Sequence, residues 1–508
     1  MELTRRRILQ MGGLAAAALA TGCATTPKTA GTGTAAAGAA GAPLVVASPA
    51  LTNSLDPAAA LSNVGATFSA QVYEPLLTFG ADGKLEPALA TAWRVIDELT
   101  VEFTLRQGVK FHRGGAFDAA AVKANVDRLL SGDPAFAFRV GQMGTLSGAE
   151  VVGPDTVRIT TDKPDPILLN RLARLAITDP AIFKEKPGSV ASGTGPFKVT
   201  AYAPAKSIDL EAFPDAWRKS ESVKSARIVS IPDPGTLTTA LRTGEIDGAY
   251  GLPPSVAAEL AGSFVVKPVP AGSCAILSMI GEVEPKLRDK RVRLALNLAV
   301  NKEEFVASGL SGYGEVPNGQ LLQPGYLGHD PSLEAFPHDP ERARALLKEA
   351  GAEGLTLNIA TTALFKQQAE ITAGYLAKVG IKCEVVIQDL SSFITSLLKK
   401  SETPLLYWQT DYVDLHDISG VNRLGPQPKG VQRHVEDEEY IKLFASSQTE
   451  MEPAKRETII KAMAKRLHDE AGVVFLAWPQ TVYVHSSKSD LTLNSDGNVL
   501  LAESRKGA

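Results

Sequence analysis

The sequence predicts an α/β protein built from more than one domain. With 508 residues, the chain is too long for a single hydrophobic core. Strands are expected at Leu355–Ile359 and Ile381–Ile387, with a helix from Gln367 to Val379 between them. Because a strand–helix–strand unit joins parallel strands, this part of the chain is predicted to form an α/β layer. Strands and helices also alternate elsewhere, without an internal repeat.

The composition is typical of a soluble globular protein. Hydrophobic residues make up 44% of the chain, charged residues make up 21%, and the net charge is −4. Because no long run of lysine and arginine is present, the sequence does not favour nucleic-acid binding.

Motifs for catalysis or for a bound cofactor are missing from the sequence. It contains no CxxC, HExxH, Walker A or GxSxG pattern, so we predict no catalytic residues, no cofactor and no metal site. Beyond residue 43 the only cysteines are Cys274 and Cys383, and their spacing leaves open whether they pair. Cys383 alternates with Ile381, which predicts a buried core position.

The N-terminal residues are expected to direct export rather than to fold. Arg5–Arg7 and the short apolar run Met11–Ala20 are typical of a twin-arginine-like signal peptide over residues 1–22. The following Cys23 is placed as the lipidated first residue of a mature lipoprotein, and residues 23–43 as a flexible tether. The alternative is an ordinary signal peptide in which Cys23 has no special role.

Apolar periodicity and turn residues predict further elements along the chain. Val122, Val126 and Leu129 form one apolar helical stripe, and Asp339 is a candidate N-cap. The predicted elements are a strand at 44–47, a helix at 66–77, a turn at Asp82–Gly83, a strand at 100–106, a helix at 119–130, a helix at 339–350 ended by Gly351, and strands at 405–408 and 473–477.

A short buried strand, Leu405–Trp408, is followed at once by acidic residues. Asp411, Asp414 and Asp417 come directly after it, together with His416. In open α/β sheets ligands bind beyond the carboxyl ends of strands, so this end is a candidate site for a cationic or polar small molecule. The alternative is a solvated acidic loop.

Several segments resemble one known family. The stretch from Tyr73 to Leu130 contains FTLRQGVKFHRGG, and GTGPF follows at 193–197. Together with VRLALNLAV and DPERARALL, in this order and spacing, they are similar to the family 5 extracellular solute-binding proteins, the peptide- and nickel-binding components of ABC importers. Arg113 and Phe213 depart from the family's pattern. His112 in this pattern is expected to belong to a structural turn rather than to bind a ligand.

The resemblance implies a two-lobed periplasmic-binding-protein-like fold of type II, with an extra inserted subdomain and a ligand cleft between the lobes. The implied segments are 44–72, 186–268 and 480–508 for lobe I, 73–185 for the inserted subdomain, and 269–479 for lobe II.

The resemblance also suggests a ligand-binding set. In peptide-binding relatives an aspartate in a W-x-x-D-Y setting holds the α-amino group of the ligand, and Trp408, Asp411 and Tyr412 match that setting. Tyr407 and Trp478 are added as candidate aromatic contacts. For Trp408 and Trp478 the alternative is core packing.

Three residues near this set have other expected roles. Asp414 and Asp417 are expected to be surface charges or helix caps. His416 is a candidate contact because a histidine binds the metal complex in nickel-binding relatives.

The implied function is that of the substrate-binding component of an ABC importer, which captures a di- or oligopeptide or a peptide-like molecule. The implied partners are the permease subunits, and the protein is expected to be a lipid-anchored monomer. Its expected location is the periplasm or the outer face of the cytoplasmic membrane, after export by the twin-arginine or the general route. Alternatives are a nickel chelate, an opine or an oligosaccharide as solute, a periplasmic receptor without a permease, and a secreted hydrolase.

Overall fold

The largest sheet of the protein combines parallel and antiparallel strands. The computed structural model describes residues 41–59, 66–80, 83–185, 188–398, 400–410, 417 and 437–507. Among these described residues the sheet has twelve strands. They follow the order β16, β15, β17, β13, β18, β11, β1, β10, β9, β8, and β12 and β14 also pair with β18. Their bounds are β1 (Leu44–Ser48), β8 (Phe197–Ala203), β9 (Ser207–Ala212), β10 (Ser225–Ser230), β11 (Gly248–Tyr250), β12 (Val265–Pro270), β13 (Ala275–Met279), β14 (Gly314–Glu315), β15 (Ile359–Thr362), β16 (Val385–Gln388), β17 (Leu405–Gln409) and β18 (Val474–His485).

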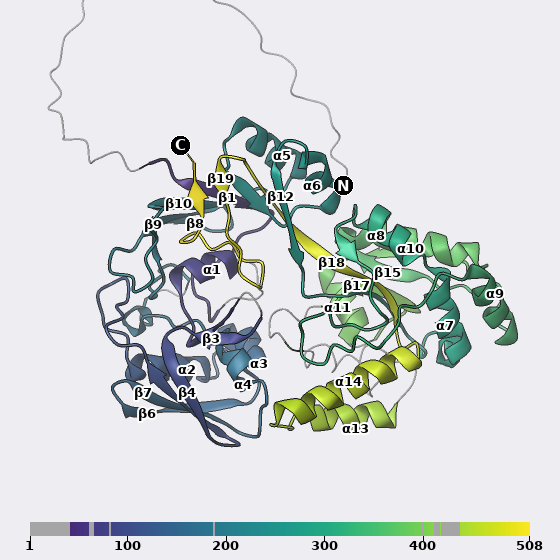
Figure 1. The fold of residues 1–508 in the computed structure, drawn as a ribbon, viewed down its shortest axis with the longest axis horizontal. Coiled ribbons are helices and arrows are strands. Elements are labelled where there is room, and N and C mark those ends of the chain that lie inside the picture. Colours follow the sequence, from purple (N-terminus) through teal and green to yellow (C-terminus); the bar gives the residue numbers. More distant parts are fainter. Residues whose placement is uncertain are drawn as a thin grey trace, which may run out of the picture. The chain divides into compact units, whose positions relative to one another are not determined.

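Strand β18 belongs to two parts of this sheet. Residues 474–477 pair with β13, whereas residues 483–485 pair with β11. Strand β12 lies antiparallel to residues 480–485 of β18, and the chain then continues through residues 271–274 into β13. Two neighbouring stretches of backbone therefore connect the β17 half of the sheet (β13, β15, β16, β17) with the β1 half (β1, β8, β9, β10, β11), as Figure 1 shows.

Helices cover both faces of the β17 half. Because successive strand residues point to opposite faces, Leu405 and Tyr407 lie in one core and Leu406 and Trp408 lie in another. The helices that pack into the first core are α7 (Lys290–Ala299), α8 (Lys302–Gly309), α9 (Pro340–Glu349) and α10 (Lys366–Lys378). Those that pack into the second are α11 (Leu390–Leu398), α13 (Glu438–Ser447) and α14 (Pro453–Asp469).

The β1 half has its own two cores. One contains Ala47 and Val484 and is covered by α5 and α6, and the other contains Val46 and Tyr483. In the second, the buried Gln71 side chain of α1 is bonded to the backbone of residues 499 and 501, which fastens the C-terminal segment to this half. The elements are α1 (Ala66–Val72), α5 (Pro234–Thr243), α6 (Pro254–Leu260), β19 (Ser489–Asp490) and β20 (Arg505–Lys506).

A separate antiparallel sheet, in the order β4, β5, β7, β6, forms a further layer. Helix α2 packs against it around Phe103, Val122 and Val157, and Asp118 caps the helix by accepting a hydrogen bond from the Ala121 amide. We propose that this layer is the inserted subdomain at residues 73–185. The boundaries predicted for lobe I and lobe II are likewise proposals. The elements are β2 (Leu77–Phe79), β3 (Leu85–Pro87), β4 (Ala90–Asp97), β5 (Thr100–Leu105), α2 (Ala119–Leu129), η1 (Pro134–Phe136), α3 (Ala137–Met143), β6 (Leu146–Gly153), β7 (Thr156–Thr161), α4 (Leu168–Leu172) and η2 (Pro180–Ile182).

The predicted parallel pairing is confirmed, with a shift in position. Strand β15 lies parallel to both β16 and β17. Strands β15 and β16 begin at residues 359 and 385, each four residues later than predicted. Cys383 is only partly buried and Ile387 is exposed, because β16 lies at the edge of the sheet. Cys383 nevertheless packs against the core of the β17 half, so the predicted buried core position is confirmed only in part.

The GTGPF segment forms a bend that lies against the C-terminal end of α1. A Cβ atom at Gly193 would lie 2.1 Å from Val72 O, and one at Gly195 would lie 2.5 Å from Gln71 O. Only glycine allows the two backbones to approach so closely, which explains both glycines of the bend.

His112 connects the separate sheet's layer to this bend. The Gly193 amide donates to His112 Nδ1 over 3.3 Å, so Nε2 carries the proton and donates it to Gly195 O at 2.9 Å. The ring also lies edge-on against Phe213, and burial lowers the pKa of His112. These contacts give His112 the structural role that the sequence predicts.

Glu74 also contacts this bend. Its buried carboxylate accepts hydrogen bonds from Thr194 Oγ1 at 2.8 Å and from Trp217 Nε1 at 2.6 Å, and burial raises the pKa of Glu74. The Arg106 guanidinium lies 4.1 Å from the centre of the Trp217 ring. Residues of several family-like motifs, which are far apart in the sequence, therefore contact one another in this region.

Candidate functional site

The candidate site is organised around the carboxyl end of β17. This strand lies between β15, to which it is parallel, and β13, to which it is antiparallel. All of its first four residues are buried, so apolar packing on both faces holds it in place. A ligand-binding residue that follows such a strand starts from a fixed backbone position.

Trp408 and Trp478 lie in the same core. Trp408 is 8% exposed and its indole N–H donates to Ser278 Oγ over 2.8 Å. Trp478 is 4% exposed and donates to Leu321 O over 3.0 Å. Both indole groups are therefore satisfied and belong to one cluster, although the residues are distant in sequence.

Tyr407 lies on the opposite face of β17. Its ring is fully buried, with ring centres 6.5 Å from Phe305 and 5.8 Å from Phe365, and burial raises its pKa. The structure therefore does not bring Tyr407 together with Trp408, and we assign it to core packing.

The end of β17 is fastened to the chain that enters β13. The Thr410 amide donates to Cys274 O, and the Cys274 amide donates to Thr410 Oγ1, both over 2.9 Å. Both residues are completely buried. Cys274 and Cys383 are free thiols, which answers the pairing question that the sequence leaves open.

Several predicted residues lie outside the described part of the chain. They are Cys23, Asp411, Tyr412, Asp414 and His416. The described residues on either side of residues 411–416 are Thr410 and Asp417.

The sequence predicts that Asp417 is a surface charge or a helix cap, and the first of these alternatives is wrong. Its side chain is 2% exposed and is paired with Arg456, which is 3% exposed. The two guanidinium nitrogens donate to the two carboxylate oxygens over 2.6 and 3.0 Å, and Arg456 Nε donates to Ser447 O. Two buried charges require each other's compensation, so this pair is structural.

Arg456, which is not among the predicted site residues, has a recognisable signal in the sequence. In α14, Arg456 shares the buried stripe of Ile460, Met463 and Leu467, at helical spacing. A charged residue in an apolar stripe indicates a buried partner, which is here Asp417.

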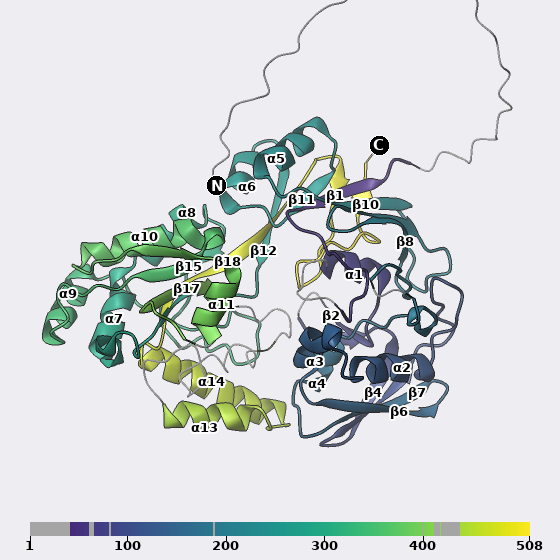
Figure 2. The same ribbon diagram turned by 180° about the vertical axis from the view of Figure 1, so that it is seen from behind.

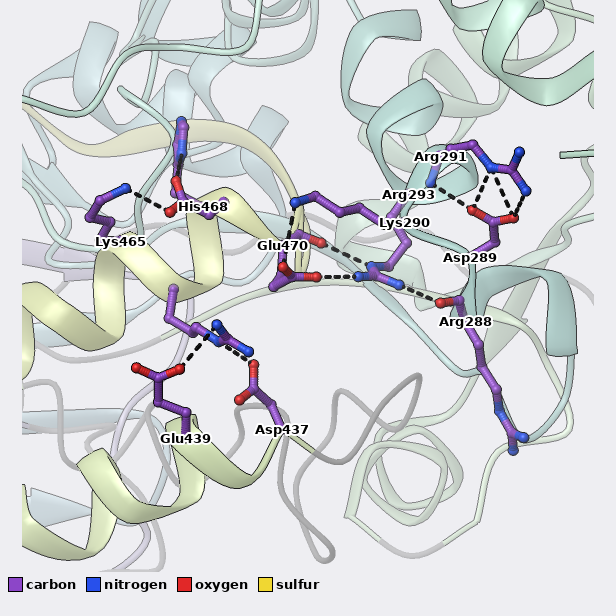
Figure 3. A network of polar contacts seen from close by, with 12 residues as sticks. Arg288, Asp289, Lys290, Arg291, Arg293, Asp437, Glu439, Lys465, His468 and Glu470 are labelled. Carbon is purple, nitrogen blue, oxygen red and sulfur yellow. Dashed lines mark hydrogen bonds and ion pairs between the residues drawn. The ribbon is translucent and has the colours of Figure 1, made fainter. Parts of the chain in front are cut away.

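Further ion pairs surround α14 (Figure 3). Arg466 donates to Asp437 over 2.6 Å; burial would raise the pKa of Asp437, but this bond and those from backbone amides lower it. The buried Arg293 donates to Glu470 O, to Glu470 Oε2 and to Arg288 O. These contacts fix α14 and the start of α13 against the rest of this half.

The described residues show no group of three or more histidine, cysteine, aspartate or glutamate residues that could hold a metal ion. Among the same residues, no helix combines the length and the apolar character that crossing a membrane requires.

Comparisons with known proteins agree with this architecture. The model of the bacterial extracellular solute-binding proteins, family 5 middle region, matches residues 84–423. The glutathione-binding protein GsiB of Salmonella paratyphi A is 31% identical over 347 residues, covering 66% of this chain and 67% of the relative. The GsiB of Pectobacterium atrosepticum is 32% identical over 351 residues, with coverage of 66% and 67%.

Solved structures give the same fold. NikA from Brucella suis in complex with Fe(III)-EDTA has a TM-score of 0.82 and 26% identity, covering 92% of this chain and 100% of that one. HbpA2 from Haemophilus parasuis has a TM-score of 0.80 and 22% identity, with the same coverage. These likenesses confirm the predicted two-lobed α/β fold.

Proposed function

Because the chain belongs to the family 5 bacterial extracellular solute-binding proteins, we propose that it captures a small peptide or peptide-like solute between its two lobes. As a binding component of an ABC importer, it delivers that solute to a membrane permease. The role is that of a transport protein and not of an enzyme.

One observation carries the choice of a peptide-like solute. Strand β17, held rigidly by packing on both faces and by the Thr410–Cys274 hydrogen bonds, ends at Gln409, two residues before Asp411 in the sequence. A carboxylate at that point suits a free α-amino group, because an ammonium forms a charge-assisted hydrogen bond with it. The GsiB relatives, which are named for binding glutathione, support a solute of this kind.

In this proposal the residues around Asp411 shield the charge pair from water. Trp408 and Trp478 are placed at the carboxyl end of β17 and at the crossing strand β18, and Tyr412 follows Asp411 directly. Excluding water strengthens a charge pair because the local dielectric constant falls.

A metal chelate is the second candidate. It is favoured by the similarity to NikA from Brucella suis, which was solved with Fe(III)-EDTA. In that case His416 would contact the complex.

A thermal-shift screen tests the proposal. The probes are glutathione, di- and tripeptides, their N-acetylated forms, nickel chelates, opines and oligosaccharides. A solute at a hundred times its Kd stabilises the native state by about 2.7 kcal/mol, which such a screen detects. We expect shifts with peptides that have a free amino group and none with the acetylated forms. Shifts with chelates or sugars alone would contradict the proposal.

Export and anchoring complete the proposed function. The arginine-rich start, the short apolar run and the Gly22–Cys23 junction support removal of residues 1–22 and lipidation of Cys23. The protein would then act as a monomer tethered by residues 23–43 outside the cytoplasmic membrane. The twin-arginine and the general export route are both compatible with this start.

A further inference from the structure

Three exposed apolar side chains lie at one edge of the β17 half. Leu364 is 77% exposed, Leu390 is 68% exposed and Ile394 is 45% exposed. Leu364 belongs to the short helix η4 (Ala363–Phe365), which follows β15, and the other two belong to α11, which follows β16. We call these three residues the apolar edge patch.

The strand register places this patch at the carboxyl edge of the parallel strands. Thr362 pairs with Gln388, so Leu364 and Leu390 both lie two residues beyond the last paired position of β15 and β16. The parallel register of β15 and β17 sets Ala360 beside Leu406. By the same register, Leu364 lies at the level of residue 410, which directly follows β17.

Helix α11 has one apolar face, made by residues at positions i, i+3, i+4 and i+7. Phe393 and Leu397 pack into the core that contains Trp408, whereas Leu390 and Ile394, also four residues apart, form the exposed side of this face. Both ribbon views show α11 beside β17 and β15 (Figures 1 and 2). Such an exposed side needs an apolar partner, since single exposed side chains are common but grouped ones mark binding surfaces.

The charged residues beside the patch already have partners. Lys366 is paired with Glu370 over 3.7 Å, and the Asp389 carboxylate accepts hydrogen bonds from the amide and hydroxyl of Ser392. These charged neighbours are thus engaged with other groups of the protein, and the apolar contact surface comes from Leu364, Leu390 and Ile394.

We propose that the apolar edge patch is a specificity subsite for apolar side chains of the solute; this rests on the proposed function. Neighbouring strands are about 4.8 Å apart, so the patch lies roughly 5 to 10 Å along the edge from β17. An extended peptide rises about 3.3 Å per residue. A peptide whose amino group is held at the end of β17 therefore reaches the patch with its second or third residue.

Calorimetry with a matched peptide set tests this. The probes are Gly-Gly-Gly, Gly-Leu-Gly and Gly-Gly-Leu, and the proteins are wild type, Leu364→Asn, Leu390→Asn and the control Val152→Asn. Val152 is an exposed residue of β6 in the separate sheet. All three substituted positions are exposed, so folding should be retained, and thermal unfolding checks that it is.

The expected pattern is specific to leucine-containing peptides. Wild type and Val152→Asn should prefer at least one of them over triglycine, and each patch variant should bind it roughly tenfold more weakly, with triglycine little changed. Unchanged binding of the leucine peptides by the patch variants overturns the subsite alone. If wild type binds no peptide at all, the proposed function fails and the subsite fails with it.

Discussion

Asp417 and Arg456 form a bidentate ion pair that is almost completely removed from solvent. Burying such a pair costs free energy because both charges lose their hydration. Removing one partner destabilises the folded state, because the other charge then stays buried without compensation. Asp417 therefore helps to hold the end of α13 and the start of α14 in place, and it differs in kind from the candidate ligand residue Asp411.

We expect Asp417→Asn to lower the free energy of unfolding by about 3–5 kcal/mol, because Arg456 stays buried without its partner. Urea denaturation measures this. The control is Asp127→Asn, which breaks the exposed Lys123–Asp127 pair of α2 and should cost less than about 1 kcal/mol. Equal effects of the two variants would show that burial of the pair contributes nothing.

His112 should make stability depend on pH. Burial lowers its pKa from the usual value of 6.5, so the folded state binds fewer protons than the unfolded state. The stabilisation is complete above about pH 6.5 and is lost as the pH falls from there through the lowered pKa. The slope is at most about 1.4 kcal/mol per pH unit for one proton.

Denaturation of wild type and of His112→Gln between pH 7.5 and about 5 checks this dependence. The difference in the free energy of unfolding between the two proteins should shrink as the pH falls. A difference that stays constant over this range would show that His112 has no such proton linkage.

At the scale of elements, the sequence predicts best where local signals decide. Asp339 caps α9 through the Arg342 amide, and Gly351 follows the helix with a φ of 60°, as the sequence indicates. The starts of β15 and β16 are predicted four residues too early. Apolar residues that pack just outside a strand pairing look the same in the sequence as residues within it.

The close contact between the bend at 193–196 and the end of α1 can be tested by substitution. Gly195→Ala should lower the free energy of unfolding by about 1–3 kcal/mol, because its Cβ would lie 2.5 Å from Gln71 O at the end of α1. The control is Gly141→Ala within α3, where no atom lies within 4 Å of the new Cβ. That change should be neutral or stabilise by up to about 1 kcal/mol, and urea denaturation compares the two. A Gly195→Ala protein as stable as wild type would refute the close approach.

The candidate site shows the limit of prediction from sequence. The alternation of buried positions along β17 separates Tyr407 from Trp408, and a period of two could have shown this. The shared cluster of Trp408 and Trp478, and the Thr410–Cys274 hydrogen bonds, depend on strands that meet only in the folded sheet. No local pattern encodes those contacts.

At the scale of the whole molecule, β12 and β18 carry the chain between the two halves of the main sheet. The end of β17 is bonded to Cys274, directly beside one of these crossings. This arrangement suits a binding protein in which the halves move about the crossings when a solute is bound.

Anchoring of the whole protein can be tested by fractionation. We expect wild-type protein in the membrane fraction, because two acyl chains on Cys23 give stable attachment. Cys23→Ser should move to the soluble fraction, and Cys383→Ser, which leaves the N-terminal region intact, should not. Cys23→Ser protein that remains with the membrane would count against lipidation.

The central claim is that Asp411 holds the amino group of a peptide-like solute, and calorimetry on Asp411→Asn tests it most directly. The peptide found by the screen is titrated into wild type, Asp411→Asn and the neighbouring control Asp414→Asn. We predict that Asp411→Asn weakens binding by about 2–5 kcal/mol, because a charged partner is lost in a site shielded from water. Asp414→Asn should change binding by less than about 0.5 kcal/mol. Equal, small losses in both variants would contradict the account.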